Sequence, residues 1–194
     1  MSKSYIDNFV TSKEFWITEH LAKAQANAKL REAFMLNYGD TATFRGTEYP
    51  LTAKAGTRAG FDGERFYLPP GLTPEQIKLL VIQIYRRLAR IYLTERVTYF
   101  VGMMGVLPAA VKVNGARTRW GSCSAKKSVN FSWRLVLADD AVIDYVVVHE
   151  LAHITQMNHS ERFWSTVEGV LPDYKERQKR LKILQQRFSA EDWE

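Results

Sequence analysis

The segment His149-Glu150-Leu151-Ala152-His153 contains the residues of this sequence best suited to chemistry. On an α-helix, residues four apart lie one above the other, so the two imidazoles face the same side and can bind one metal ion. Glu150 projects about 100° further round the helix, within reach of a water molecule on that metal. This HExxH pattern is typical of a metal-dependent hydrolase in which the glutamate is the general base.

A third histidine, His159, lies six residues beyond His153. In a continuous helix the two would be about 9 Å apart along the axis, too far to share one ion. His159 can reach the metal only if the chain turns back. The sequence permits this, because Asn158 tolerates a left-handed helix end and Ser160 with Glu161 suits a new helix start. Three imidazoles with one open position are the ligand set of a catalytic zinc site.

The helix that carries the motif is predicted to be buried. Asp139 or Asp140 supplies its N-cap, and its body is almost wholly apolar, with Val142, Ile143, Val146, Val147 and Leu151. Burying two histidines and a glutamate costs free energy unless they have a partner, and a metal ion is the simplest one. This argues against the alternative, in which the motif is only part of a helix surface. The remaining histidine, His20, falls in a separate amphipathic helix and has no predicted catalytic role.

Further elements must hold this helix in place. A long helix over 72–102 has Thr73 as N-cap, Pro74 at its first position and Gln76 to complete a capping box. The other predicted elements are a helix over 12–34, short antiparallel strands within 39–71, strands over 109–113, 117–123 and 129–135, and two shorter helices from Ser160 and near Pro172.

Composition and charge exclude some classes. With 194 residues, 46% apolar and 25% charged, the chain is neither fibrous nor strongly disordered. It is long enough to fold without a structural metal, so a metal site indicates function. Between Arg96 and Ala138 there are seven basic residues and no acidic one, which gives this segment a charge of +7. The net charge of the whole chain is +6, so the remaining residues together carry −1. Such a segment is either a solvated face or attracts an acidic peptide, a phosphate or nucleic acid.

The expected compartment is the cytoplasm. The single cysteine, Cys123, excludes an intramolecular disulfide, and residues 1–12 contain no basic leader followed by an apolar run. The longest weakly polar run, 97–111, is too short to span a bilayer and contains Pro108. We therefore expect no contact with a membrane and a reducing environment.

Several segments around the motif resemble one protein family. They are Arg119-Trp120-Gly121-Ser122-Cys123-Ser124, Asn130-Phe131-Ser132-Trp133-Arg134-Leu135, residues 145–153, and Asn158-His159-Ser160-Glu161-Arg162-Phe163-Trp164. With these segments the sequence resembles the YgjP-like metallopeptidases, relatives of the SprT-like proteases in the zincin group, most strongly over 111–181. Gln156 stands where metzincins have glycine, which favours this branch over an astacin-like one. The resemblance implies a zinc-dependent hydrolase with Zn2+ bound by His149, His153 and His159, and with Glu150 as the catalytic carboxylate.

The strand before the motif helix is the candidate substrate-binding element. In zincin-like folds an edge strand near the metal pairs with an extended peptide. The residues predicted to line this cleft are Arg119, Trp120, Gly121 and Ser122. Core packing is the alternative for Trp120 and Trp133. For Cys123, a small buried hydrophobe competes with a metal ligand or a latency switch.

Residues after the motif have predicted supporting roles. Phe163 and Trp164 are expected to anchor the returning segment against the core. Tyr174 either stabilises an oxyanion or lies on a surface helix. Carboxylates that orient the metal-binding histidines are also expected, and the candidates are Asp139, Asp144, Glu168 and Asp173.

Together these features predict an α+β fold. A zincin-like core over 72–194, made of a small antiparallel sheet, the active-site helix and C-terminal helices, follows a small helix and strand section over 1–71. The predicted function is that of a zinc metallopeptidase with a protein or peptide substrate. Two alternatives stay open: a nucleotide or phosphoanhydride hydrolase that holds its nucleotide with the basic segment 112–134, and a DNA-associated protein with a mainly structural metal.

Overall fold

The computed structural model describes residues 3–193, which form two compact units. The larger unit, Met35–Leu184, contains every histidine except His20. The described parts of Met1–Phe34 and Gln185–Glu194 make up the other unit. These units do not coincide with the predicted boundary at residue 71, and the division into domains 1–71 and 72–194 stays a prediction about independent folding.

The smaller unit is mainly helical. α2 (Glu14–Glu32) confirms the helix predicted over 12–34, and a further helix, α1 (Lys3–Ser12), precedes it. No residue of α2 is buried. The rings of Phe34 and Trp193 pack with their centroids 5.0 Å apart, so the C-terminal segment contacts the end of the N-terminal segment in this unit.

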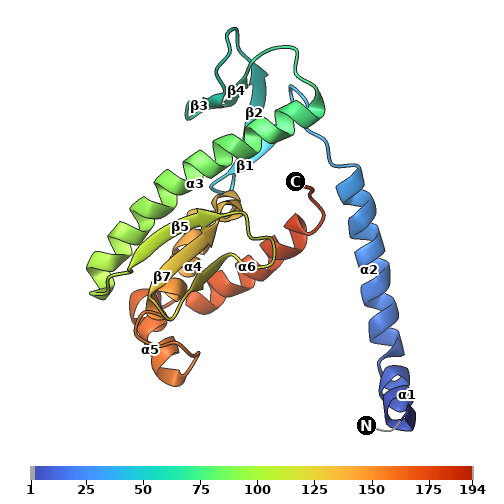
Figure 1. Cartoon of the computed structure of the whole chain (residues 1–194), viewed down its shortest axis with the longest axis vertical. Helices are drawn as coiled ribbons and strands as arrows, with labels where there is room; N and C mark the ends of the chain where they lie inside the picture. The colour runs from blue at the N-terminus through green and yellow to red at the C-terminus, as the bar shows by residue number, and fades with distance from the viewer. Residues whose placement is uncertain (1–2, 194) are drawn as a thin grey trace. The chain divides into compact units, whose positions relative to one another are not determined.

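The larger unit begins with a four-stranded sheet in the order β1-β2-β4-β3 (Figure 1). β1 and β2 form an antiparallel hairpin, but β2 and β4 are parallel, so the expectation of only antiparallel strands within 39–71 is wrong. The reason is that β3 pairs with the outer side of β4, which leaves β4 free to lie beside β2. The strands are β1 (Thr41–Phe44), β2 (Thr47–Ala53), β3 (Gly60–Phe61) and β4 (Phe66–Leu68).

The long helix α3 (Pro74–Met104) connects the two sheets. As predicted, Thr73 and Gln76 form a capping box, in which the Thr73 N–H donates to Gln76 Oε1 at 2.9 Å. Gly105, with a φ of 64°, ends the helix in the left-handed region that favours glycine. α3 packs against strands of both sheets and against the motif helix (Figure 1).

The second sheet lies beside the motif helix and has the order β5-β7-β6. β6 (Gly121–Cys123) and β7 (Ser128–Ser132) form the predicted hairpin, but β5 (Ala110–Asn114) is parallel to β7. The predicted antiparallel sheet is therefore mixed, because the loop after β5 carries the chain past the place of β7 to the far edge. β6 is an edge strand, paired on one side only.

Two predicted strands are shorter than expected. Of the strand predicted over 117–123, only residues 121–123 form β6, and Trp120 adds one backbone hydrogen bond from the Ser132 N–H. The strand predicted over 129–135 ends at Ser132, where a 3-10 helix, η1 (Trp133–Leu137), begins. Ser132 caps η1 by accepting from the Arg134 N–H, so a local side-chain contact ends the strand.

The motif lies on α4 (Asp140–Ala152), which packs between α3 and β6. Asp139 is its N-cap and accepts from the Val142 N–H at 3.2 Å. α5 (Glu161–Val170) and α6 (Tyr174–Phe188) follow. The α+β class is confirmed. No helix of the described chain is long and apolar enough to cross a membrane.

Candidate metal centre

Three histidines, two at the end of α4 and one just before α5, lie close together. His149 lies in the last turn of the helix, His153 is its C-cap residue, and His159 lies just before α5. Each offers one ring nitrogen, and these three atoms lie within 4.8 Å of one another. The chain therefore turns back as predicted. It does so without a left-handed Asn158, since Arg45 and Lys127 are the non-glycine residues with positive φ in the described structure.

The backbone after α4 fixes the orientation of His153. The Nδ1 of His153 lies 3.0 Å from the carbonyl oxygen of Gln156, to which it donates. This contact leaves Nε2 of His153 as the nitrogen with a free lone pair for a metal. Sequence reasoning assigned this orienting task to a carboxylate and missed the carbonyl of Gln156. The only sequence signal was the position of Gln156, one turn after a helix end.

Aromatic rings support all three imidazoles. The fully buried ring of Phe163 has its centroid 4.6 Å to 4.9 Å from those of His149, His153 and His159. Trp164 stacks on His159 with centroids 5.6 Å apart. The anchoring role expected for Phe163 and Trp164 fits these contacts.

Tyr174 continues this aromatic stack. Its ring stacks on Trp164 with centroids 5.3 Å apart. Because only 7% of Tyr174 is exposed, the expectation of a surface tyrosine is wrong. A role for its hydroxyl group in stabilising an oxyanion stays a prediction.

The electrostatics of the cluster favour neutral imidazoles. Burial lowers the pKa of His149 to about 3, and the neighbouring His153 and His159 add to this effect. Burial also lowers the pKa of His153. Neutral imidazole is the form that binds a metal ion.

The donor set fits a divalent cation. Nε2 of His149 and Nε2 of His159 lie only 3.0 Å apart, and the Nδ1 of His149 is buried with no hydrogen-bond partner in the described structure. Neutral imidazoles whose Nε2 atoms come this close can direct their lone pairs at one cation. A metal ion can therefore be bound by the three imidazoles.

Glu150 lies next to this cluster and is buried. Only 7% of the residue is exposed, and burial raises the pKa of its carboxyl group to about 7, while Arg119 acts in the opposite direction. The carboxylate faces the backbone of β6 at Gly121. The site thus combines three converging imidazoles with a carboxyl group that can exchange a proton near neutral pH.

Comparison with known proteins agrees with this geometry. The model of the family described as YgjP-like, metallopeptidase domain, matches residues 1–184. The chain belongs to this family. Membership implies a catalytic metal and a protein or peptide substrate. No curated protein matches the chain.

Solved structures similar to this YgjP-like chain include two metallopeptidase zymogens. One is abylysin of Pyrococcus abyssi, with 22% identity and a TM-score of 0.43, over 46% of this chain and 90% of that one. The other is jannalysin of Methanocaldococcus jannaschii, with 20% identity and a TM-score of 0.42, over 48% of this chain and 94% of that one.

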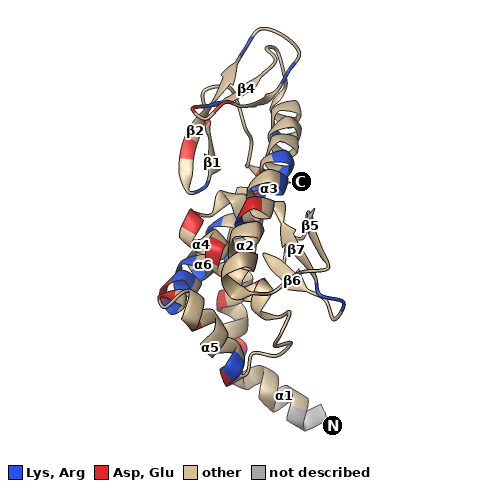
Figure 2. Cartoon of the chain, turned by 90° about the vertical axis from the view of Figure 1, so that its left-hand side faces the viewer, with Lys and Arg blue, Asp and Glu red and all other residues tan. Residues whose placement is uncertain are grey.

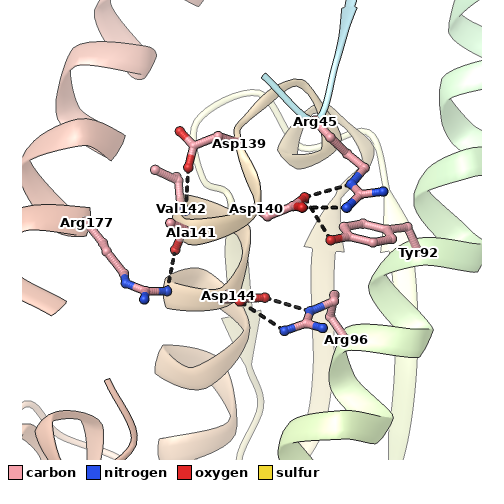
Figure 3. A network of polar contacts seen from close by, with 9 residues as sticks. All are labelled: Arg45, Tyr92, Arg96, Asp139, Asp140, Ala141, Val142, Asp144 and Arg177. Atoms are coloured by element: carbon pink, nitrogen blue, oxygen red, sulfur yellow. Dashed lines mark hydrogen bonds and ion pairs between the residues drawn. The ribbon is translucent and has the colours of Figure 1, made fainter. Parts of the chain in front are cut away.

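The predicted carboxylates of the YgjP-like chain lie elsewhere. Asp139 and Asp144 anchor the N-terminal half of α4, in a network that also includes Asp140 (Figure 3). Asp173 pairs with Arg177, and Glu168 is exposed. No hydrogen bond joins any of these carboxylates to the three histidines in the described structure, so this part of the prediction is wrong.

The predicted substrate-binding residues lie along β6 and just before it. Gly121 and Ser122 are half-buried on β6, Trp120 is half-buried, and Arg119 is exposed. Trp133, by contrast, is 1% exposed and stacks on Tyr85, which confirms core packing for this tryptophan.

Cys123 and the basic residues lie around the same strand. Cys123 is half-buried and is not part of the histidine cluster. Burial and the nearby Glu150 raise the pKa of its thiol, which does not favour a reactive thiolate. Figure 2 shows basic residues at the turn that joins β6 and β7, where Lys126 and Lys127 lie in the sequence.

Proposed function

We propose that the chain hydrolyses peptide bonds, with a zinc ion held by His149, His153 and His159 and with Glu150 as general base. The observation that carries this proposal is the convergence of three ring nitrogens within 4.8 Å beside a buried carboxyl group. An all-imidazole ligand set suits zinc better than magnesium or calcium. When bound, zinc lowers the pKa of its water and polarises the carbonyl group of the scissile bond.

The residues of the chain perform the proton transfers. The carboxylate of Glu150 accepts the proton of the attacking water and delivers it to the leaving nitrogen. Its raised pKa of about 7 supports this role, since a general base works best when its pKa lies near the working pH. The Gln156 carbonyl keeps the imidazole of His153 in one tautomer.

The edge strand β6 is the proposed site of substrate binding. Its free side can pair with an extended peptide beside the metal centre, using main-chain hydrogen bonds. We assign Arg119, Trp120, Gly121 and Ser122 to this surface. The exposed guanidinium of Arg119 would contact the substrate chain close to Glu150. The cytoplasm is the proposed location, which the absence of a disulfide-forming cysteine pair supports.

Metal content and protein cleavage, measured on the same samples, test this function. We expect about one zinc per wild-type chain, loss of zinc in His153→Ala, and retained zinc without cleavage in Glu150→Gln. Absence of zinc after reconstitution would refute the ligand assignment. Zinc without cleavage, together with release of phosphate from nucleotides, would replace the peptidase with a nucleotide hydrolase.

A further inference from the structure

Gly121 lies directly against the carboxyl group of Glu150. A Cβ atom built on Gly121 would lie 2.6 Å from Cγ, 2.7 Å from Oε1 and 2.9 Å from Cδ of Glu150. These distances are shorter than van der Waals contact allows. Any side chain at position 121 must therefore displace Glu150, the strand or the helix.

The backbone does not require glycine at this position. Gly121 is not among the residues with positive φ, and it pairs with Phe131 in the regular register between β6 and β7. Glycine in a strand weakens it, so its presence often marks the close approach of another group. Here that group is the side chain of Glu150.

The surroundings of Glu150 offer it little room to move aside. Glu150 is 7% exposed and lies on a helix whose neighbours Leu151 and Ala152 are fully buried. No hydrogen bond of the Glu150 carboxylate is found within residues 3–193. The carboxyl group packs against the bare backbone of Gly121, and Arg119 acts on it through charge without a hydrogen bond.

We propose that Gly121 is a positioning residue, whose missing side chain leaves the space in which the Glu150 carboxylate stands beside the three histidines. The proposal rests on the proposed role of Glu150 as general base. It changes the role given to Gly121 above, from lining the substrate cleft to placing the base. The three atoms nearest to a Cβ at this position all belong to Glu150, so its side chain is the first group that the Cβ would displace.

Gly121→Ala tests this inference, with Gly115→Ala as the matched control. Gly115 lies in the loop before β6, has no positive φ, and its nearest neighbours to a Cβ lie 3.8 Å away. We expect Gly121→Ala to keep its zinc and lose about 100-fold in kcat, because general-base catalysis contributes about that much. KM should change little. Gly115→Ala should keep wild-type kcat and zinc.

Combination with Glu150→Gln separates positioning from general damage. If Gly121 acts only through Glu150, the double variant is no slower than Glu150→Gln alone, since coupled residues are not additive. A further loss in the double variant would overturn the proposal. So would wild-type kcat in zinc-loaded Gly121→Ala.

Thermal unfolding tests the packing without any assay of activity. Gly121→Ala should lower the Tm of the protein with Glu150 by a few degrees, and should not lower it when Glu150 is replaced by alanine. Equal effects in both backgrounds would refute the steric conflict. If Gly121→Ala lowers the Tm only when Glu150 is present but the wild type cleaves no protein, the steric contact between Gly121 and Glu150 is supported and the proposed peptidase function is refuted.

Discussion

At the N-terminal end of α4, three carboxylates each have a cationic partner. Figure 3 shows two of these pairs, Arg45 with Asp140 and Arg96 with Asp144. Asp140 accepts from Arg45 and from Tyr92, with Arg45 Nε at 2.7 Å and the Tyr92 hydroxyl at 2.8 Å. The other two pairs are Arg96 with Asp144, at 2.7 Å, and Arg180 with Asp139, at 2.8 Å.

The C-terminal end of the same helix lacks such partners. The carboxylate of Glu150 forms no ion pair within residues 3–193, and the Nδ1 of His149 is buried without a hydrogen bond there. The pKa shifts of Asp140 and Glu150 are opposed, and burial also raises the pKa of Asp144. Hydrogen bonding from Arg45 lowers the pKa of Asp140, whereas burial raises that of Glu150 to about 7.

The comparison indicates a division of labour along one helix. The N-terminal half connects α4 to α3, α6 and the β1–β2 turn, so it supplies stability and fixes the position of the helix. The C-terminal half leaves the Glu150 carboxylate without an ion pair and gathers ring nitrogens of three histidines, which costs stability but keeps these groups available for a substrate and a metal. The two halves should therefore respond differently to substitution.

The largest effect should follow from Glu150→Gln. We expect cleavage to fall about 100- to 10,000-fold, because the variant cannot accept a proton. Its Tm should not fall, since a neutral amide replaces a carboxyl group that burial already disfavours as an anion. Steady-state kinetics and calorimetry on zinc-loaded protein check this. A large loss of stability would contradict the proposed division of labour, because it would show that Glu150 stabilises the fold.

Metal removal should give the next largest effect. Zinc at 100 times its Kd stabilises the folded chain by about 2.7 kcal/mol, if it binds only that state. Unfolding followed with zinc and with a chelator measures the difference. His153→Ala should abolish the response, whereas Arg90→Met on α3 should retain it. A zinc response that survives in His153→Ala would place the ion elsewhere.

The convergence of His149, His153 and His159 could be predicted from the sequence, because helical spacing and a cap residue after a short turn are local features. The orienting carbonyl of Gln156 could not, since every residue has a carbonyl and only the path of the chain selects one. The contact between Gly121 and Glu150 joins residues that are distant in the sequence, so no local pattern reports it.

The same distinction explains the fold. α3 was predictable from its capping box at Thr73 and Gln76, which acts within one turn. The parallel pairing of β5 with β7 depends on the path of the loop between β5 and β6. The residues of β6 do not determine that path. The partners of Asp140 and Asp144 are Arg45 and Arg96, which lie 95 and 48 residues away in the sequence, so no local pattern reports them.

Loss of Arg96 should have the next effect, on stability alone. Arg96→Met keeps the length of the side chain but leaves Asp144, whose side chain is 16% exposed, without its cation. Burial already raises the pKa of Asp144 against the effects of Arg96 and Arg177, so removal of Arg96 should destabilise the fold by about 2 kcal/mol. Denaturant unfolding measures this, with exposed Arg90→Met as control. The kcat of zinc-loaded protein should stay unchanged. A lower kcat would show that the N-terminal half of α4 also affects catalysis, against the division of labour.

The smallest effect should be a pH-dependent one at Asp140. Arg45, by hydrogen bonding, and then Tyr92 hold the pKa of Asp140 below its ordinary 3.8, so the folded state binds this proton less readily than the unfolded state. The contribution of Asp140 to stability is therefore complete above 3.8 and is lost as the pH falls through the lowered value.

Comparing wild type with Asp140→Asn isolates this contribution, because other carboxyl groups titrate alike in both. We expect a difference of no more than about 1 kcal/mol at pH 7, since the pair with Arg45 is half-exposed and screened by solvent. The difference should shrink as the pH falls below 3.8 and should decrease with added salt. A difference that grows toward low pH would have the wrong sign for a stabilising pair. In that case Asp140 would resemble Glu150, and the contrast between the two ends of α4 would rest on Asp139 and Asp144 alone.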